Sequence, residues 1–76
     1  MNKERRRELN EISLLLAQCA ERLEAVRDEE KDYFDNMPEA IQMGEKGDRA
    51  EEVITVLDEA VDGIETVNDS VTEALS

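Results

Sequence analysis

Carboxylates with the spacing of a metal site stand in the middle of the chain, in the stretch DEEKDYFDNMPE at residues 28–39. Oxygen-bearing side chains occupy positions 1, 3, 5, 9 and 12 of a twelve-residue calcium loop: Asp28, Glu30, Asp32, Asn36 and Glu39. Such a loop needs glycine at position 6 for its sharp turn, and Tyr33 stands there instead. Calcium binding is therefore not expected.

Two acidic pairs, Glu29-x-x-Asp32 and Glu59-x-x-Asp62, have a spacing that could hold magnesium between two helices. A shared ion requires carboxylates on sides of the helices that face each other. The apolar repeat described below places Asp32, Glu59 and Asp62 on outward positions. We therefore predict that the chain holds no metal and no other cofactor.

The chain also lacks the side chains of common catalytic sites. It has no histidine, the residue whose ordinary pKa best suits proton transfer near neutral pH. Cys19 is the only cysteine, and it falls on the apolar repeat with no base beside it, as expected of a small buried hydrophobic residue. The stretch GEKGD lacks the preceding strand and the lysine placement of a phosphate-binding loop. We predict that the protein is not an enzyme.

Two apolar repeats indicate the elements that carry these residues. In the first half, apolar residues recur at alternating spacings of three and four, the pattern of a helix packed along another helix. The positions of this predicted seam are Leu9, Ile12, Leu16, Cys19, Leu23, Val26, Glu30, Tyr33 and Met37. The second half has the same spacing at Ala50, Ile54, Leu57, Val61, Ile64, Asn68, Val71 and Leu75, beside a column of Val53, Ala60, Val67 and Ala74.

Together the repeats predict an all-α fold, an antiparallel two-helix hairpin that dimerises into a helical bundle, with a single domain over residues 1–76. The helices are expected at about residues 3–35 and 48–74, joined by a bend over residues 36–47. Asp48 is expected to cap the second helix with Glu51 as its capping-box partner. Gly44 is expected to end a short turn in the left-handed conformation.

The chain's two aromatic residues lie where the first helix enters the bend. Tyr33 falls on the predicted seam, whereas Phe34 falls beside it and needs cover from the bend or from another chain. Side chains here either close the end of the two-helix core or face a partner. The candidate partner-binding residues are Tyr33, Phe34, Met37, Ile41 and Met43.

The first helix has more apolar surface than one partner helix can cover. Leu14, Leu15 and Leu16 point in three directions, which indicates a second chain. Asn68 interrupts the second repeat, either as a polar residue that fixes the register or as a partly exposed residue near a fraying end. We therefore expect a homo-oligomer, with Leu14, Leu15 and Asn68 as candidate contacts.

The net charge of −12 is unevenly placed, since residues 1–27 carry +1, residues 28–48 carry −6 and residues 49–76 carry −7. An acidic surface repels nucleic acid and anionic lipid, so no direct nucleic-acid binding and no membrane binding are expected. It suits a protein partner with a basic surface, such as a nucleic-acid-binding protein, or serves only solubility. The candidate acidic face consists of Asp28, Asp32, Asp58, Glu59, Asp62 and Glu65. A single cysteine and the absence of a signal-peptide pattern predict a cytoplasmic location.

The segment EEKDYFDNMPE, followed by a polar link with glycines and by AEEVITVLDEAVDGIETVNDSV, resembles small acidic helical proteins of phages and prophages of Gram-positive bacteria. The resemblance extends over residues 28 to about 70 and is sharpest from Tyr33 to Glu39. It implies a phage-encoded protein in the cytoplasm of a host cell, and it implies no particular activity.

Functions of three classes fit these observations. A non-catalytic binding module would present its carboxylates to a host protein that handles nucleic acid or nucleotides, such as a defence effector, and would inhibit it. A structural or assembly module would oligomerise or bridge other phage proteins. A small-ligand site between protomers is the third class, although few basic residues outside the N-terminal cluster are available to hold an anion.

Overall fold

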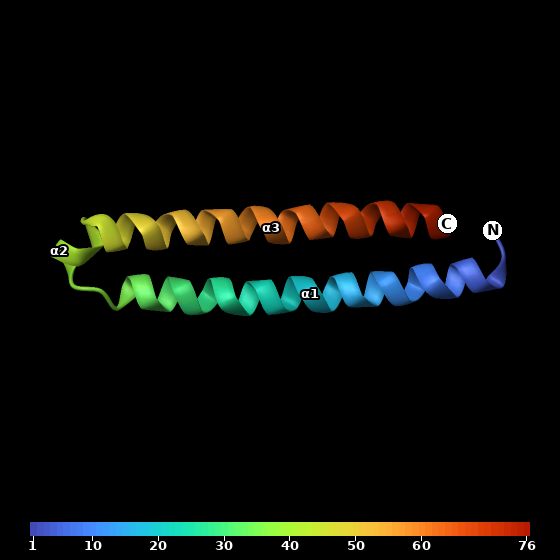
Figure 1. The fold of residues 1–76 in the computed structure, drawn as a ribbon, viewed down its shortest axis with the longest axis horizontal. Helices are drawn as coiled ribbons and strands as arrows, with labels where there is room; N and C mark the ends of the chain where they lie inside the picture. Colours follow the sequence, from blue (N-terminus) through green and yellow to red (C-terminus); the bar gives the residue numbers. More distant parts are fainter.

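The computed structural model describes all 76 residues, and it consists of helices without any strand, which confirms the predicted all-α class. The helices are α1 (Lys3–Asp35), α2 (Glu39–Gln42) and α3 (Glu45–Leu75). Figure 1 shows α1 and α3 side by side and antiparallel, with α2 at one end and both termini at the other. The result is a rod of 59 × 14 × 13 Å. Neither long helix has an apolar stretch long enough to cross a membrane.

Local capping explains where α1 begins and ends. The side chain of Asn2 accepts a hydrogen bond from the backbone N–H of Arg5 at 2.8 Å, which satisfies one of the free donors of the first turn. At the other end, the side chain of Asn36 donates to the carbonyl of Asp32 at 2.8 Å. Pro38 then prevents the helix from continuing through the bend.

The start of α3 differs from the prediction. Helix α3 begins at Glu45, with Gly44 as its N-cap, so Asp48 lies within the first turn and does not cap it. Gly44 has a φ of −99°, and the left-handed conformation predicted for it is wrong. The physical reason is that α2 leads into α3 directly: the N–H of Gly44 donates to Ile41, and its carbonyl accepts from Asp48.

Gly47 is the residue that permits this tight passage from α2 to α3. It is buried, and a Cβ at this position would clash with the backbone carbonyl of Gln42. Backbone atoms cannot yield to such a contact, so only glycine fits here. The carboxamide of Gln42 in turn donates to the carbonyl of Phe34 at 2.8 Å, which ties α2 to the end of α1.

The seam between α1 and α3 is the chain's only core. On α3 the side chains at the predicted seam positions are buried or half-buried, with Ala50 and Val61 buried. On α1 part of the predicted seam is wrong. The predicted positions Leu9, Ile12, Leu16, Leu23 and Glu30 are half-buried, as is Met37 in the bend, but Cys19, Val26 and Tyr33 are exposed. In their place Ala20, Arg27 and Phe34 are buried or half-buried, and Ser13 is half-buried beside Ile12.

Exposure decides between the two columns of α1. Ala20 is buried, whereas Cys19 is exposed and the residues Val26 and Tyr33 are 51% and 53% exposed. The hydroxyl of Ser13 donates to Asn68 at 2.6 Å, and Arg27 donates to Asp58 at 2.9 Å, so the less apolar column finds polar partners on α3. The rotation of α1 is therefore set by these partners together with the small side chain of Ala20.

Candidate functional site

The two long helices present different residue types on the two sides of the rod. Successive residues of a helix are about 100° apart, so the residue before a seam position and the residue after it lie on opposite sides of the seam. Because α1 and α3 are antiparallel and face each other, residues that precede the seam positions lie on the same side of the rod in both helices. Residues that follow the seam positions share the other side.

The side formed by the preceding residues is apolar, and we call it the apolar face. Its apolar members on α1 are Ile12, Leu15, Cys19, Val26 and Tyr33, and the charged residues Glu8, Arg22 and Glu29 lie among them. On α3 its members are Val53, Val56, Ala60, Gly63, Val67, Ser70 and Ala74, with Arg49 at the start of the helix. A shallow groove on α1, whose lining includes Leu15, Cys19, Glu21, Arg22 and Val26, borders this face. Ile12, Val53 and Ala60 are half-buried, and the larger apolar residues Leu15, Val26, Tyr33, Val56 and Val67 are more than half exposed.

The side formed by the following residues is acidic, and we call it the acidic face. Its carboxylates are Glu21, Glu24, Asp28, Asp35, Glu51, Asp58, Asp62, Glu65 and Asp69. A shallow groove between the helices, lined in part by Glu21, Glu24 and Glu65, lies on it. Lys31 lies among these carboxylates, and Lys3 and Arg7 occupy corresponding positions at the start of α1, so the face is strongly negative except at that end.

The two ion pairs of Arg27 show that residues directly after seam positions in α1 and in α3 lie on the same side of the rod. Its guanidinium donates to Asp58 of α3 at 2.9 Å and contacts Asp28 of α1 at 3.2 Å. The hydrogen bond to Asp58, with a smaller contribution from Asp28, raises the pKa of Arg27 above its ordinary value. The ion pair joins the two helices and partly neutralises two of the carboxylates on the acidic face.

Four of the six predicted acidic residues lie on the acidic face, and the other two lie on the outer edges of the rod. Asp28, Asp58, Asp62 and Glu65 belong to the acidic face. Asp32 and Glu59 come two residues after a seam position and therefore lie on the outer edges of the rod, away from the other helix. The sequence prediction missed Glu21, Glu24, Asp35, Glu51 and Asp69, whose signal is their position one residue after the seam.

The predicted partner-binding residues at the bend are also divided. Tyr33, Met37 and Ile41 line one shallow groove together with Lys46, whereas Phe34 lines another with Asp35 and Ile54. Met43 is exposed and lines neither of them. The expectation that Tyr33 packs in the seam and Phe34 stands beside it is reversed, because Phe34 belongs to the column that α1 turns toward α3.

The three predicted oligomer contacts lie in different places. Leu15 is on the apolar face, and Leu14 is on the opposite side. Asn68 lies in the seam, where its side chain accepts the hydrogen bond from Ser13, so its polar group already has a partner within the chain.

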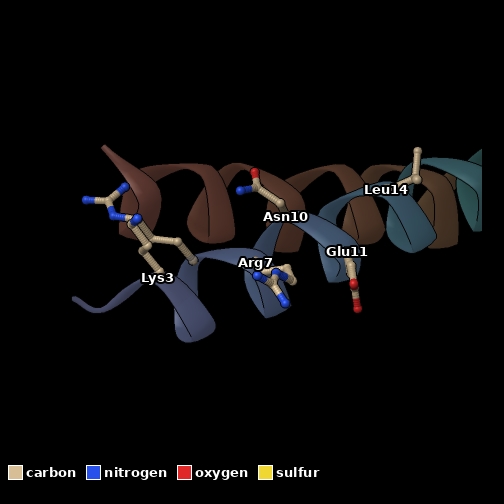
Figure 2. Close-up of a pocket in the computed structure, with 6 residues that line it drawn as sticks. Lys3, Arg7, Asn10, Glu11 and Leu14 are labelled. Carbon is tan, nitrogen blue, oxygen red and sulfur yellow. The ribbon is translucent and has the colours of Figure 1, made fainter.

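The basic residues at the start of α1 form a separate feature. Lys3, Arg6, Arg7, Asn10, Glu11 and Leu14 line a shallow groove on successive turns of the helix (Figure 2). Arg6 donates to the carbonyl of Leu75 at 2.7 Å, which satisfies a free acceptor at the end of α3 and places a cation at the negative end of its dipole.

The structure brings together no group of three or more histidine, cysteine, aspartate or glutamate side chains that could hold a metal ion. Glu29, Asp32, Glu59 and Asp62 are all exposed. Cys19 is free and exposed, which corrects its predicted burial. Comparisons with protein-family models, with curated proteins and with solved structures give no match for this chain.

Proposed function

We propose that this chain is a non-catalytic protein-binding module that uses its acidic face to bind the basic surface of another protein. The gathering of carboxylates on one side of a rod is the observation that supports this proposal. Most successive carboxylates of one helix are three or four residues apart on this face, which places them about 5–6 Å from each other, and the gaps from Asp28 to Asp35 and from Glu51 to Asp58 are two turns long. Each helix therefore presents a line of negative charge.

A groove lined by lysine and arginine is the partner surface that suits such a line. Proteins that handle nucleic acids or nucleotides have grooves of this kind, because they neutralise phosphates. The acidic face would occupy the groove in place of the phosphates, and complementary potentials would speed the encounter. The proposed role is inhibition of a host nucleic-acid- or nucleotide-handling defence protein, and the proposed phage setting rests on the resemblance of the segment Tyr33–Glu39.

Affinity capture from a bacterial host lysate at low and at high salt tests this proposal. The captured protein should be basic, should dissociate as salt rises and should be displaced by DNA or RNA. The variant Asp62→Asn/Glu65→Gln should capture less of it. The control Asp32→Asn/Glu59→Gln removes the same number of charges from the outer edges and should capture nearly as much as the unchanged chain. Capture that is insensitive to salt, or equal loss in both variants, would contradict the proposal.

A structural or assembly module is the second candidate, in which the hairpin oligomerises or bridges other phage proteins. The uncovered apolar face favours it, because isolated exposed apolar residues are ordinary whereas a continuous apolar face indicates an interface. Light scattering that gives the mass of a single chain at micromolar concentration would count against self-assembly.

A further inference from the structure

We propose that the apolar face is the interface of a symmetric homodimer, in which two copies pack with their bends at opposite ends and the twofold axis passes near Cys19 and Gly63. This interface lies on the side of the rod opposite to the acidic face. The inference therefore stands whether or not the acidic face binds a basic protein.

The single chain leaves much of its apolar surface without cover. Ala20, Ala50 and Val61 are its only buried hydrophobic residues, and Leu15, Val26, Tyr33, Val56 and Val67 on the apolar face are all more than half exposed. A chain of this length is marginally stable alone, and oligomerisation is a common way to complete its core. The apolar face supplies the surface that a second copy would cover.

The distribution of residues on this face suits a copy of itself. The hydrogen bond between Ser13 and Asn68 places these two residues at the same level along the axis of the rod. Cys19 lies six residues after Ser13 on α1, and Gly63 lies five residues before Asn68 on the antiparallel α3. Cys19 and Gly63 are therefore also at nearly the same level. Both helices continue the apolar face on either side of this level. A twofold axis here would set Ile12 against Val26 of the second copy, and an isologous interface requires such self-matching.

Gly63 supports close contact at the same level. Glycine within a helix destabilises the helix relative to alanine. A Cβ at Gly63 would meet nothing within 4 Å, so no contact within the chain requires glycine here. Small side chains on this side of α3 allow α3 of the second copy to approach closely. These residues are Ala60, Gly63, Ser70 and Ala74.

Charge favours bends at opposite ends. Residues 28–48 carry a net charge of −6, so bends at the same end would bring two such segments together. Bends at opposite ends instead set this segment beside residues 1–27 of the second copy, which carry +1. In that arrangement Arg5 comes near Tyr33 of the second copy, and its guanidinium can form a cation–π interaction with the aromatic ring.

The rod is long enough for an extended contact with a second copy. Helix α1 is about 50 Å long at 1.5 Å per residue, and the rod measures 14 × 13 Å across. The outline of this side is therefore roughly 700 Å², charged residues included, and a standard interface buries roughly 800 Å² of each partner's surface.

Adjacent leucines provide a matched test of the face. Leu14 and Leu15 are 60% and 63% exposed and lie on opposite sides of the rod. Sedimentation equilibrium should show that Leu15→Lys raises the dimer dissociation constant at least about tenfold, as expected for a charge placed in an apolar interface. Leu14→Lys should leave the dissociation constant nearly unchanged. A monomeric unchanged chain, or equal effects of the two substitutions, would overturn the proposal.

Cysteine cross-linking tests the orientation. With bends at opposite ends, mild oxidation should join Cys19 to Cys19 of the second copy, and Cys19→Ala/Gly63→Cys should also cross-link to itself. With bends at the same end, neither chain would cross-link alone, but Gly63→Cys with Cys19 retained would join the two positions across the interface. The control Cys19→Ala/Thr66→Cys has its thiol on the outer edge of the rod and measures cross-linking by random collision. Cross-linking yields of the other variants that are no higher than the yield of this control would also overturn the proposal.

Discussion

Arg27 of α1 donates to Asp58 of α3 at 2.9 Å from a position that belongs to the seam between the two helices. A charged residue thus occupies a place that an apolar residue takes in most helix pairs. The stem of Arg27 packs in the seam, and its guanidinium reaches the acidic face, where it contacts Asp28 and Asp58.

Substitutions of Arg27 should separate its packing from its charge. Arg27→Met keeps an apolar stem and should change the free energy of unfolding only slightly, because exposed ion pairs contribute little. Arg27→Asp should destabilise the chain by more than that, since it places a third carboxylate beside Asp28 and Asp58. Urea unfolding followed by circular dichroism measures both, and equal stabilities would show that the ion pair does not hold the helices together.

The hydrogen bond between Ser13 and Asn68 should show strong coupling. Asn68→Leu alone leaves the part-buried hydroxyl of Ser13 without its partner and should cost about 1–2 kcal/mol. The double variant Ser13→Ala/Asn68→Leu replaces both polar groups and should be close to the unchanged chain in stability, or above it. A double-mutant cycle from urea unfolding gives the coupling, and additive effects would contradict the prediction.

The two helical glycines should respond to alanine in opposite directions. Gly47→Ala forces a Cβ against the backbone of Gln42 and should destabilise the chain by about 1–3 kcal/mol. Gly63→Ala meets no atom in the chain and should stabilise the helix by about 0.5–1 kcal/mol at concentrations where the chain is monomeric. Thermal unfolding at concentrations below the dimer dissociation constant compares the two, and a loss of stability in both would contradict the prediction.

The N-cap of α1 should contribute measurably despite its exposed position. Asn2→Ala removes the acceptor for the N–H of Arg5 and should cost about 1 kcal/mol. Asn10→Ala, which places the better helix former at an exposed mid-helix position, should be neutral or slightly stabilising. Thermal unfolding distinguishes them, and equal stabilities would show that the first turn is frayed in solution.

The sequence predicts the helices better than it predicts their rotation. The repeat of α3 places Ile54, Val61 and Asn68 in the seam, as observed, because its neighbouring columns are less apolar or made of smaller residues. Helix α1 has the shared column of Leu9 and Leu16 with a candidate column on either side. Apolarity alone selects the column of Cys19 and its neighbours.

The choice made by α1 depends on contacts that no single-helix pattern contains. Ser13 and Arg27 become acceptable in the seam only because Asn68 and Asp58 stand opposite them. The acidic face was predicted incompletely for the same reason, since its membership follows from the seam. At the bend, Gly47 allows α3 to start before Asp48, and the close approach of Gln42 that requires this glycine is a tertiary contact.

Each face lies only one residue from the seam, and this has a consequence for how the chain tolerates a change in length. Helix α1 runs from Lys3 to Asp35 without a glycine, proline or bulge that could absorb an extra residue. An insertion or deletion within it would turn everything beyond that point by about 100°. Beyond an insertion of one residue, the apolar face would turn into the seam, the seam residues would turn onto the acidic side and the carboxylates would turn to the outer edge. Substitutions on either face are therefore a far milder form of variation than a change of length by one residue.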